Sequence, residues 1–278
     1  MSQLNYMMIT ASPEIALFIE QHGVARIFMD QEERGKAERQ GHLDTHMVVH
    51  SLEEIAAVAC VLNQAELMVR LNPLYAGTRL EIDSVLDHGA QRLMLPMFTT
   101  RDEVAAFLDL IGGRVPATFL AETPQALVRL PDWLPLLTPG HDEVHIGLND
   151  LSLGMGLNFL FEPMAARLLD PSAELLNQQG VTWGIGGIAC IGHGELAAET
   201  VLGEYVRLES QWVILSRTFH GGAVSSSELM EQLDFADEIA KLREAEVQWR
   251  HADCAALQAN QKELAACAFR LGRSGRLA

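Results

Sequence analysis

Residues 92–110, RLMLPMFTTRDEVAAFLDL, show the pattern that decides the fold. The first part, 92–97, is a short and mostly apolar run, typical of a strand buried on both faces of a parallel sheet. The second part, 101–110, has apolar residues at helical spacing and follows Thr100, with Glu103 three positions later as a helix-start signal. The stretch therefore predicts one β-strand followed by one α-helix.

The same unit recurs along the chain. The expected strands cover 6–10, 26–30, 66–72, 92–97, 117–122, 144–150, 183–189 and 212–216. The helices expected between them cover 13–22, 52–63, 80–88, 101–110, 124–130, 160–177 and 195–208. Eight such units close naturally into an α/β fold of the (β/α)8 TIM-barrel type, and an open doubly wound sheet is the alternative that periodicity leaves open.

The C-terminal part is longer than the last helix of a barrel needs to be. It begins with a cap sequence, Ser225-Ser226-Ser227-Glu228, and continues through residues 229–271 without proline. We expect residues 1–222 to form the barrel and 223–278 to form one or two additional C-terminal helices. These helices pack either on a neighbouring subunit or on the barrel of their own chain.

Composition limits the class of protein. The 278 residues include 37 Asp and Glu against 20 Lys and Arg, and 49% of them are hydrophobic. The acidic balance argues against nucleic acid or an anionic membrane as the partner. Four cysteines without a CxxC pair indicate a reducing compartment, and no segment approaches the roughly 18 apolar residues of a membrane span. The sequence predicts a soluble, cytoplasmic protein that acts on small molecules.

Polar residues at the ends of the expected strands are the candidates for chemistry, because the βα loops of a barrel build its active-site face. These residues are Asp30 with Glu32 and Glu33, Arg70 with Asn72, Glu122, Asn149 with Asp150, and Ser216 with Arg217. The two carboxylates Glu122 and Asp150 are ligands of the kind that Mg²⁺ or another divalent ion such as Mn²⁺ prefers. Arg70 near such an ion would complement a carboxylate or an enolate oxygen.

Two further patterns have competing interpretations. Residues 184–194, GIGGIACIGHG, match a loose dinucleotide fingerprint, but they fall within the expected seventh strand, where glycines more often permit close approach of backbones. His42, His46 and His50 are four residues apart, which on a helix would place them on one face suited to zinc. A solvated loop, with one imidazole acting as an acid or base, is the other interpretation.

Five motifs occur in order: VRLNP at 69–73, LMLP at 93–96, FLAET at 119–123, HIGLNDLSLGMG at 145–156, and the long segment 184–219. With these motifs the chain resembles the HpcH/HpaI aldolase and citrate lyase beta-subunit family. The resemblance implies a phosphoenolpyruvate/pyruvate-type TIM barrel that uses a divalent metal to stabilise an enolate while a carbon–carbon bond is made or broken.

The resemblance also implies roles for individual residues. Glu122 and Asp150 match the metal ligands, and Arg70 matches the arginine that contacts the keto or enolate oxygen. The backbone around Leu148, Asn149 and Asp150 matches the turn that receives the substrate carboxylate. Family members assemble as homo-oligomers, trimers or hexamers, whose C-terminal helices pack across subunits.

The sequence departs from the family after the second strand. Pyruvate aldolases of the family carry a proton-transferring histidine directly after an Asp-x-Glu tract, where this chain has Glu33. Citrate lyase beta subunits carry an aspartate there, followed by a lysine and an arginine that resemble Lys36 and Arg39. We therefore expect Glu33 to transfer the proton, with His42 or His46 as alternatives.

Within the same tract, we expect Asp30 and Glu32 to orient metal-bound water or the base. The expected activity is that of a metal-dependent pyruvate aldolase of the class II type, which cleaves or forms a 4-hydroxy-2-oxo acid from an oxo acid and an aldehyde. A citryl-CoA or malyl-CoA type lyase, and a catalytically inert barrel with a structural or regulatory role, are the alternatives.

Overall fold

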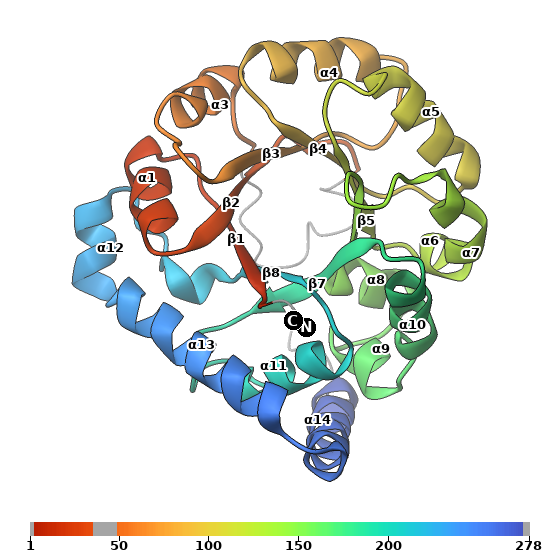
Figure 1. The fold of residues 1–278 in the computed structure, drawn as a ribbon, viewed down its shortest axis with the longest axis vertical. Helices are drawn as coiled ribbons and strands as arrows, with labels where there is room; N and C mark the ends of the chain where they lie inside the picture. The colour runs from red at the N-terminus through yellow and green to blue at the C-terminus, as the bar shows by residue number, and fades with distance from the viewer. Residues whose placement is uncertain (1–2, 36–48, 275–278) are drawn as a thin grey trace.

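The computed structural model describes residues 3–35 and 49–274, which form a closed barrel of eight parallel strands, paired in the order β1 to β8 (Figure 1). The strands are β1 (Asn5–Ile9), β2 (Val24–Asp30), β3 (Glu66–Arg70), β4 (Arg92–Leu95), β5 (Ala117–Ala121), β6 (Glu143–Ile146), β7 (Thr182–Ile188) and β8 (Trp212–Leu215). Pairing of β1 with β8 closes the ring. The expected (β/α)8 barrel is confirmed, and the open doubly wound sheet is excluded.

Helices surround the strands as an outer ring (Figure 1). They are α1 (Pro13–Gln21), α3 (Leu52–Ala59), α4 (Thr78–Asp87), α5 (Arg101–Ile111), α6 (Pro124–Val128), α7 (Leu130–Trp133), α8 (Leu148–Gly154), α9 (Glu162–Ala165), α10 (Asp170–Gln178) and α11 (Ala198–Arg207), with the 3₁₀ turns η1 (Leu134–Leu136) and η2 (Arg217–Phe219). The helix-start signal at Thr100 is confirmed as a reciprocal capping box with Glu103, which satisfies backbone N–H groups that the helix itself leaves free.

Several expected elements are shorter in the structure, and two differ in a way that bears on the site and the outer ring. The helix expected over 160–177 is divided into α9 and α10, because the backbone at Arg167 adopts a left-handed conformation with φ of 58°. The strand expected over 144–150 ends at Ile146, and α8 begins at Leu148 after Gly147. As a result, Asp150 lies in the first turn of a helix rather than at the end of a strand.

Alternate residues of each strand point into the barrel, which fills the interior in layers. At the N-terminal ends of the strands, Arg26 and Arg92 form ion pairs with Glu66 and Glu143. The middle layer is an apolar cluster of Met7, Phe28, Met68, Met94, Leu120 and Trp212. The interior therefore separates the ion-paired end of the barrel from the opposite end, where the βα loops lie.

The C-terminal segment forms α12 (Ser226–Gln232), α13 (Phe235–His251) and α14 (Cys254–Ser274). Helix α13 packs along α11, and α14 packs on α9 and α11 (Figure 1). Gly203 of α11 permits this approach, because a Cβ atom there would lie 2.6 Å from Nδ2 of Asn260. The Trp249 indole donates a hydrogen bond of 2.8 Å to the carbonyl of Glu199. Within the described chain, the C-terminal helices thus pack on helices of the outer ring.

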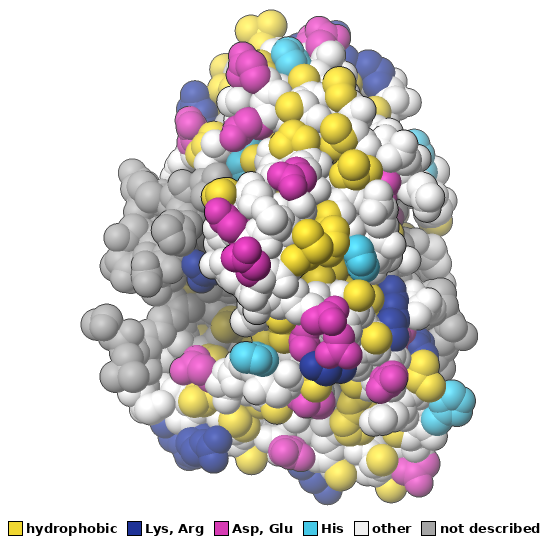
Figure 2. Space-filling model, turned by 90° about the vertical axis from the view of Figure 1, so that its left-hand side faces the viewer, with side chains coloured by type: hydrophobic (Ala, Val, Ile, Leu, Met, Phe, Trp, Pro, Cys, Tyr) yellow, Lys and Arg dark blue, Asp and Glu magenta, His cyan; other side chains and the backbone are white. Residues whose placement is uncertain are grey.

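The flank formed by α1, α12 and α13 mixes acidic, basic and apolar side chains among the residues drawn in colour (Figure 2). Within the described part of the chain, none of the helices combines the length and apolar character needed to cross a membrane.

Candidate active site

A cavity of about 340 Å³ opens among the C-terminal ends of the strands. Its ionisable lining residues come from four different strands or from the segments that follow them: Arg70, Glu122, His145, Asp150, Arg217 and His220. In barrels of this type the loops at this end vary while the strands support them. The cavity is therefore the candidate active site.

Arg70, the last residue of β3, is fixed by the carboxylates of Asp30, the last residue of β2, and of Glu32 in the loop that follows. Its Nε and Nη2 atoms donate hydrogen bonds of 2.9 and 2.6 Å to the two oxygens of Asp30, and Nη2 lies 3.4 Å from Glu32. Burial alone would lower the pKa of Arg70, but these neighbouring charges raise it above its ordinary value. Nη1 makes no hydrogen bond within residues 3–35 and 49–274, so this atom is available to an oxygen in the cavity.

Glu122 follows β5 and is only 3% exposed. Burial raises the pKa of its carboxyl group well above the usual value; Arg70 opposes this rise, whereas the charges of Asp150 and Glu32 add to it. The Met97 N–H donates to Glu122 Oε1 over 3.1 Å, from a backbone with the uncommon φ of 56°. A carboxylate held in this way favours a neighbouring cation.

Asp150 reaches the cavity from the first turn of α8. Gly147, the residue before this helix, is required to lack a side chain, because a Cβ atom would lie 2.8 Å from Cβ of Glu122. Leu148, Asn149 and Asp150 all line the cavity, and the backbone N–H groups of a first helical turn have no acceptor within their own helix. The carboxylate and these N–H groups lie on the same side of the cavity.

The structure brings most of the expected site residues together. Arg70, Glu122, Leu148, Asn149 and Asp150 line one cavity, and Asp30 and Glu32 hold Arg70 there.

Glu33 is placed differently. Its side chain is exposed and lines a separate hollow with Asn72 and Glu81, while its backbone N–H donates to Asn72 Oδ1 over 3.0 Å. His50 is buried, and its Nδ1 accepts a hydrogen bond of 3.0 Å from the Asp30 N–H. Lys36, Arg39, His42 and His46 lie outside the described residues.

Two cavity residues were not expected from the sequence. His145 of β6 donates from Nε2 to the Gly186 carbonyl over 3.1 Å, and burial lowers its pKa to about 4, so its ring is neutral. His220 follows η2, and its Nδ1 accepts from the Gly222 N–H over 3.1 Å. Burial and then the charge of Arg217 lower the pKa of His220. The position of His220 five residues beyond β8, in the loop RTFHGG, was the available signal.

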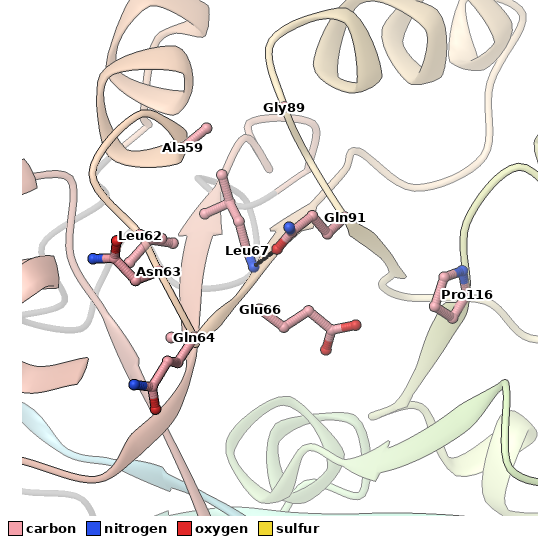
Figure 3. Close-up of a pocket in the computed structure, with 10 residues that line it drawn as sticks. Ala59, Leu62, Asn63, Gln64, Glu66, Leu67, Gly89, Gln91 and Pro116 are labelled. Carbon is pink, nitrogen blue, oxygen red and sulfur yellow. Dashed lines mark hydrogen bonds between the residues drawn. The ribbon is translucent and has the colours of Figure 1, made fainter. Parts of the chain in front are cut away.

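A second hollow of about 420 Å³ lies at the opposite end of the barrel, among the loops before β3 and β4 (Figure 3). Apart from Glu66, its lining is apolar or amide, and Oε1 of Gln91 accepts a hydrogen bond from the N–H of Leu67. The sole charged lining residue in this described region, Glu66, already pairs with Arg26 and Arg92. This hollow therefore offers no free charge for catalysis.

The two carboxylates of the cavity, Glu122 and Asp150, could supply some of the ligands of a divalent cation such as Mg²⁺. Among the described residues, no group of three or more His, Cys, Asp or Glu side chains is gathered closely enough to hold a metal ion. Mg²⁺, however, is usually bound through one or two carboxylates, with water and substrate as its other ligands. Glu122 and Asp150 supply such a pair, and both carboxyl groups line the same cavity.

Comparison with known proteins finds similar structures but no similar sequence among family models or curated proteins. Among 539 solved chains that match its structure is the citrate synthase SbnG, 15% identical, with a TM-score of 0.57 over 77% of this chain and 87% of that chain. The likeness is one of fold. Because one barrel fold hosts many chemistries, the activity has to be argued from the site.

Proposed function

We propose that this protein is a divalent-metal-dependent carbon–carbon lyase that cleaves or forms a 4-hydroxy-2-oxo acid through a pyruvate-type enolate. The observation that supports this most directly is the juxtaposition of Arg70 with the buried carboxylates Glu122 and Asp150 in one cavity. An enolate needs its charge neutralised where it develops, and a preorganised guanidinium supplies part of that stabilisation.

In this proposal each residue has a separate task. Nη1 of Arg70 donates to the keto oxygen that becomes the enolate oxygen, while Asp30 and Glu32 keep the guanidinium in place. The N–H groups at Leu148 and Asn149 bind the substrate carboxylate. Glu122 and Asp150 would hold the divalent cation, which supplies further charge neutralisation when bound.

The proposal is tested by oxaloacetate decarboxylation, because this reaction needs enolate stabilisation without an aldehyde. Metal-stripped protein is assayed for pyruvate release with and without added Mg²⁺ or Mn²⁺. We expect Asp150→Asn to lower the metal-dependent rate by about 100-fold or more, because a ligand of the charge-neutralising cation is lost.

Asp132→Asn is the matched control. Asp132 is exposed on the surface, and its nearest ion-pair partner, Arg101, is 4.0 Å away and also exposed. Equal rates in the Asp150→Asn variant and the wild type would contradict the proposal. Wild-type protein without activity above the free-ion background would shift the proposal to a CoA thioester substrate or an inert barrel, and calorimetry with a CoA ester would follow.

In the same proposal, His220 donates a hydrogen bond to the hydroxyl oxygen on C4 of the 4-hydroxy-2-oxo acid. With Nδ1 accepting from Gly222, the neutral ring carries its proton on Nε2 and acts as a hydrogen-bond donor. We expect His220→Gln to lower kcat/KM for cleavage of a 4-hydroxy-2-oxo acid about tenfold, the value of one neutral hydrogen bond, and to affect oxaloacetate decarboxylation less.

Glu33→Gln is measured in parallel, since Glu33 is the residue proposed from the sequence for proton transfer. A loss of cleavage in Glu33→Gln with full activity in His220→Gln would assign this step to Glu33 and remove His220 from the mechanism.

A further inference from the structure

An apolar cavity of about 270 Å³ adjoins the candidate active site and is separate from the hollow at the opposite end of the barrel. The two cavities share Leu160, Gly187 and Ser216 in their linings, so they meet at these residues. The apolar cavity lies between the loop before α9, the end of β7 and helix α11. These are the positions at which a barrel adapts to its substrate rather than maintains its fold.

The lining of this cavity is strongly apolar. It includes the rings of Phe159 and Phe161, whose centroids are 5.5 Å apart, together with Ile188, Leu196 and Val201. Among the described residues that line it, Glu195 is the one charged side chain, and no Lys or Arg is present. The chamber thus suits hydrocarbon, and a carboxylate inside it would lose its hydration without gaining a cation.

Strand β7 has a bulge near its C-terminal end, where the two cavities share lining residues. The register between β7 and β8 shifts between Gly184 and Gly187, so β7 has one extra residue there. The Gly186 carbonyl accepts from His145, and the Gly187 carbonyl accepts from the Tyr205 hydroxyl over 2.9 Å. Buried side chains therefore hold a bulge between the cavities, an arrangement common beside active sites.

We infer that this apolar cavity binds the hydrocarbon part of the aldehyde half of the substrate. The inference rests on the proposed function and adds a substrate class: 4-hydroxy-2-oxo acids with an uncharged aliphatic or aromatic group on C4. In cleavage, the C3–C4 bond breaks and its electron pair enters the pyruvate enolate. The C4 hydroxyl passes its proton to water in the cavity as C4 becomes the carbonyl of the released apolar aldehyde, and the enolate takes up a proton from water to become pyruvate.

The first test is the aldol addition of pyruvate, with Mg²⁺ present, to acetaldehyde, butanal, hexanal, benzaldehyde and the charged succinic semialdehyde. Each methylene that enters the cavity is expected to raise kcat/KM about fourfold, which corresponds to about 0.8 kcal/mol of transfer free energy. Succinic semialdehyde is expected to react more slowly than butanal, which has the same number of carbons.

Two variants connect this preference to the cavity. Val201→Phe fills the cavity and is expected to lower the ratio of kcat/KM for hexanal to that for acetaldehyde, whereas Phe161→Ala enlarges it and is expected to raise that ratio. Val247→Phe is the matched control, because Val247 is 51% exposed on α13, and it is expected to keep the wild-type ratio. A ratio measured within one variant does not depend on its overall folding yield.

The outcomes separate the two proposals. Wild-type decarboxylation of oxaloacetate together with a preference for succinic semialdehyde, or with ratios unchanged in both cavity variants, overturns the apolar aldehyde assignment and leaves the proposed lyase standing. Absence of metal-dependent decarboxylation in the wild type overturns both.

Discussion

Arg70→Lys is expected to lower the rate of metal-dependent oxaloacetate decarboxylation by about 10² to 10³-fold, because one preorganised donor to a developing oxyanion is lost. The lysine keeps the positive charge between Asp30 and Glu32 but has no planar fork. It can no longer bond both oxygens of Asp30 while presenting a further N–H to the cavity. The measurement is kcat for pyruvate release at saturating metal.

Arg79→Lys provides the control for this substitution, because Arg79 lies exposed on α4 and away from the cavity. Circular dichroism and thermal unfolding show whether each variant is folded. A folded Arg70→Lys protein with wild-type kcat would remove Arg70 from enolate stabilisation and reduce its role to holding Asp30 and Glu32.

Arg26→Met is expected to lower the free energy of unfolding by about 3 kcal/mol, because the buried Glu143 carboxylate loses its nearest cation and keeps only the more distant Arg92. Arg26 is 2% exposed, donates to Glu66 over 2.7 Å and to both oxygens of Glu143, and stacks 3.8 Å above the Trp212 ring. Arg92 compensates only in part, since its guanidinium lies 3.6 Å from Glu143. Urea titration followed by tryptophan fluorescence measures the loss.

Arg101→Met serves as the comparison for a surface ion pair, since Arg101 and Asp132 are about half exposed and 4.0 Å apart. Its expected cost is below about 1 kcal/mol. Equal costs for the two variants would mean that the ion pairs at the N-terminal end of the barrel are solvated and do not stabilise the fold.

The sequence by itself predicted the architecture, because the relevant signals act over a few neighbouring residues. The apolar runs marked all eight strands of the described barrel, and the Thr100 capping box fixed the start of α5. Arg70 and Glu122 were found in the same way, since a polar residue at the end of an apolar strand stands out locally. Local signals erred where the chain turns sharply: the strand expected over 144–150 ends early, and Asp150 lies on a helix.

Only the tertiary structure decided which of these residues meet. Glu33 is one position from the buried Glu32, yet it faces a separate hollow, whereas His220 comes from the far end of the chain and lines the cavity. The apolar chamber combines Phe161, Ile188 and Val201 from three segments, none of which signals a cavity alone. The physical reason is that closing the barrel brings eight strand ends to one rim, and the direction of each loop depends on packing between residues distant in sequence.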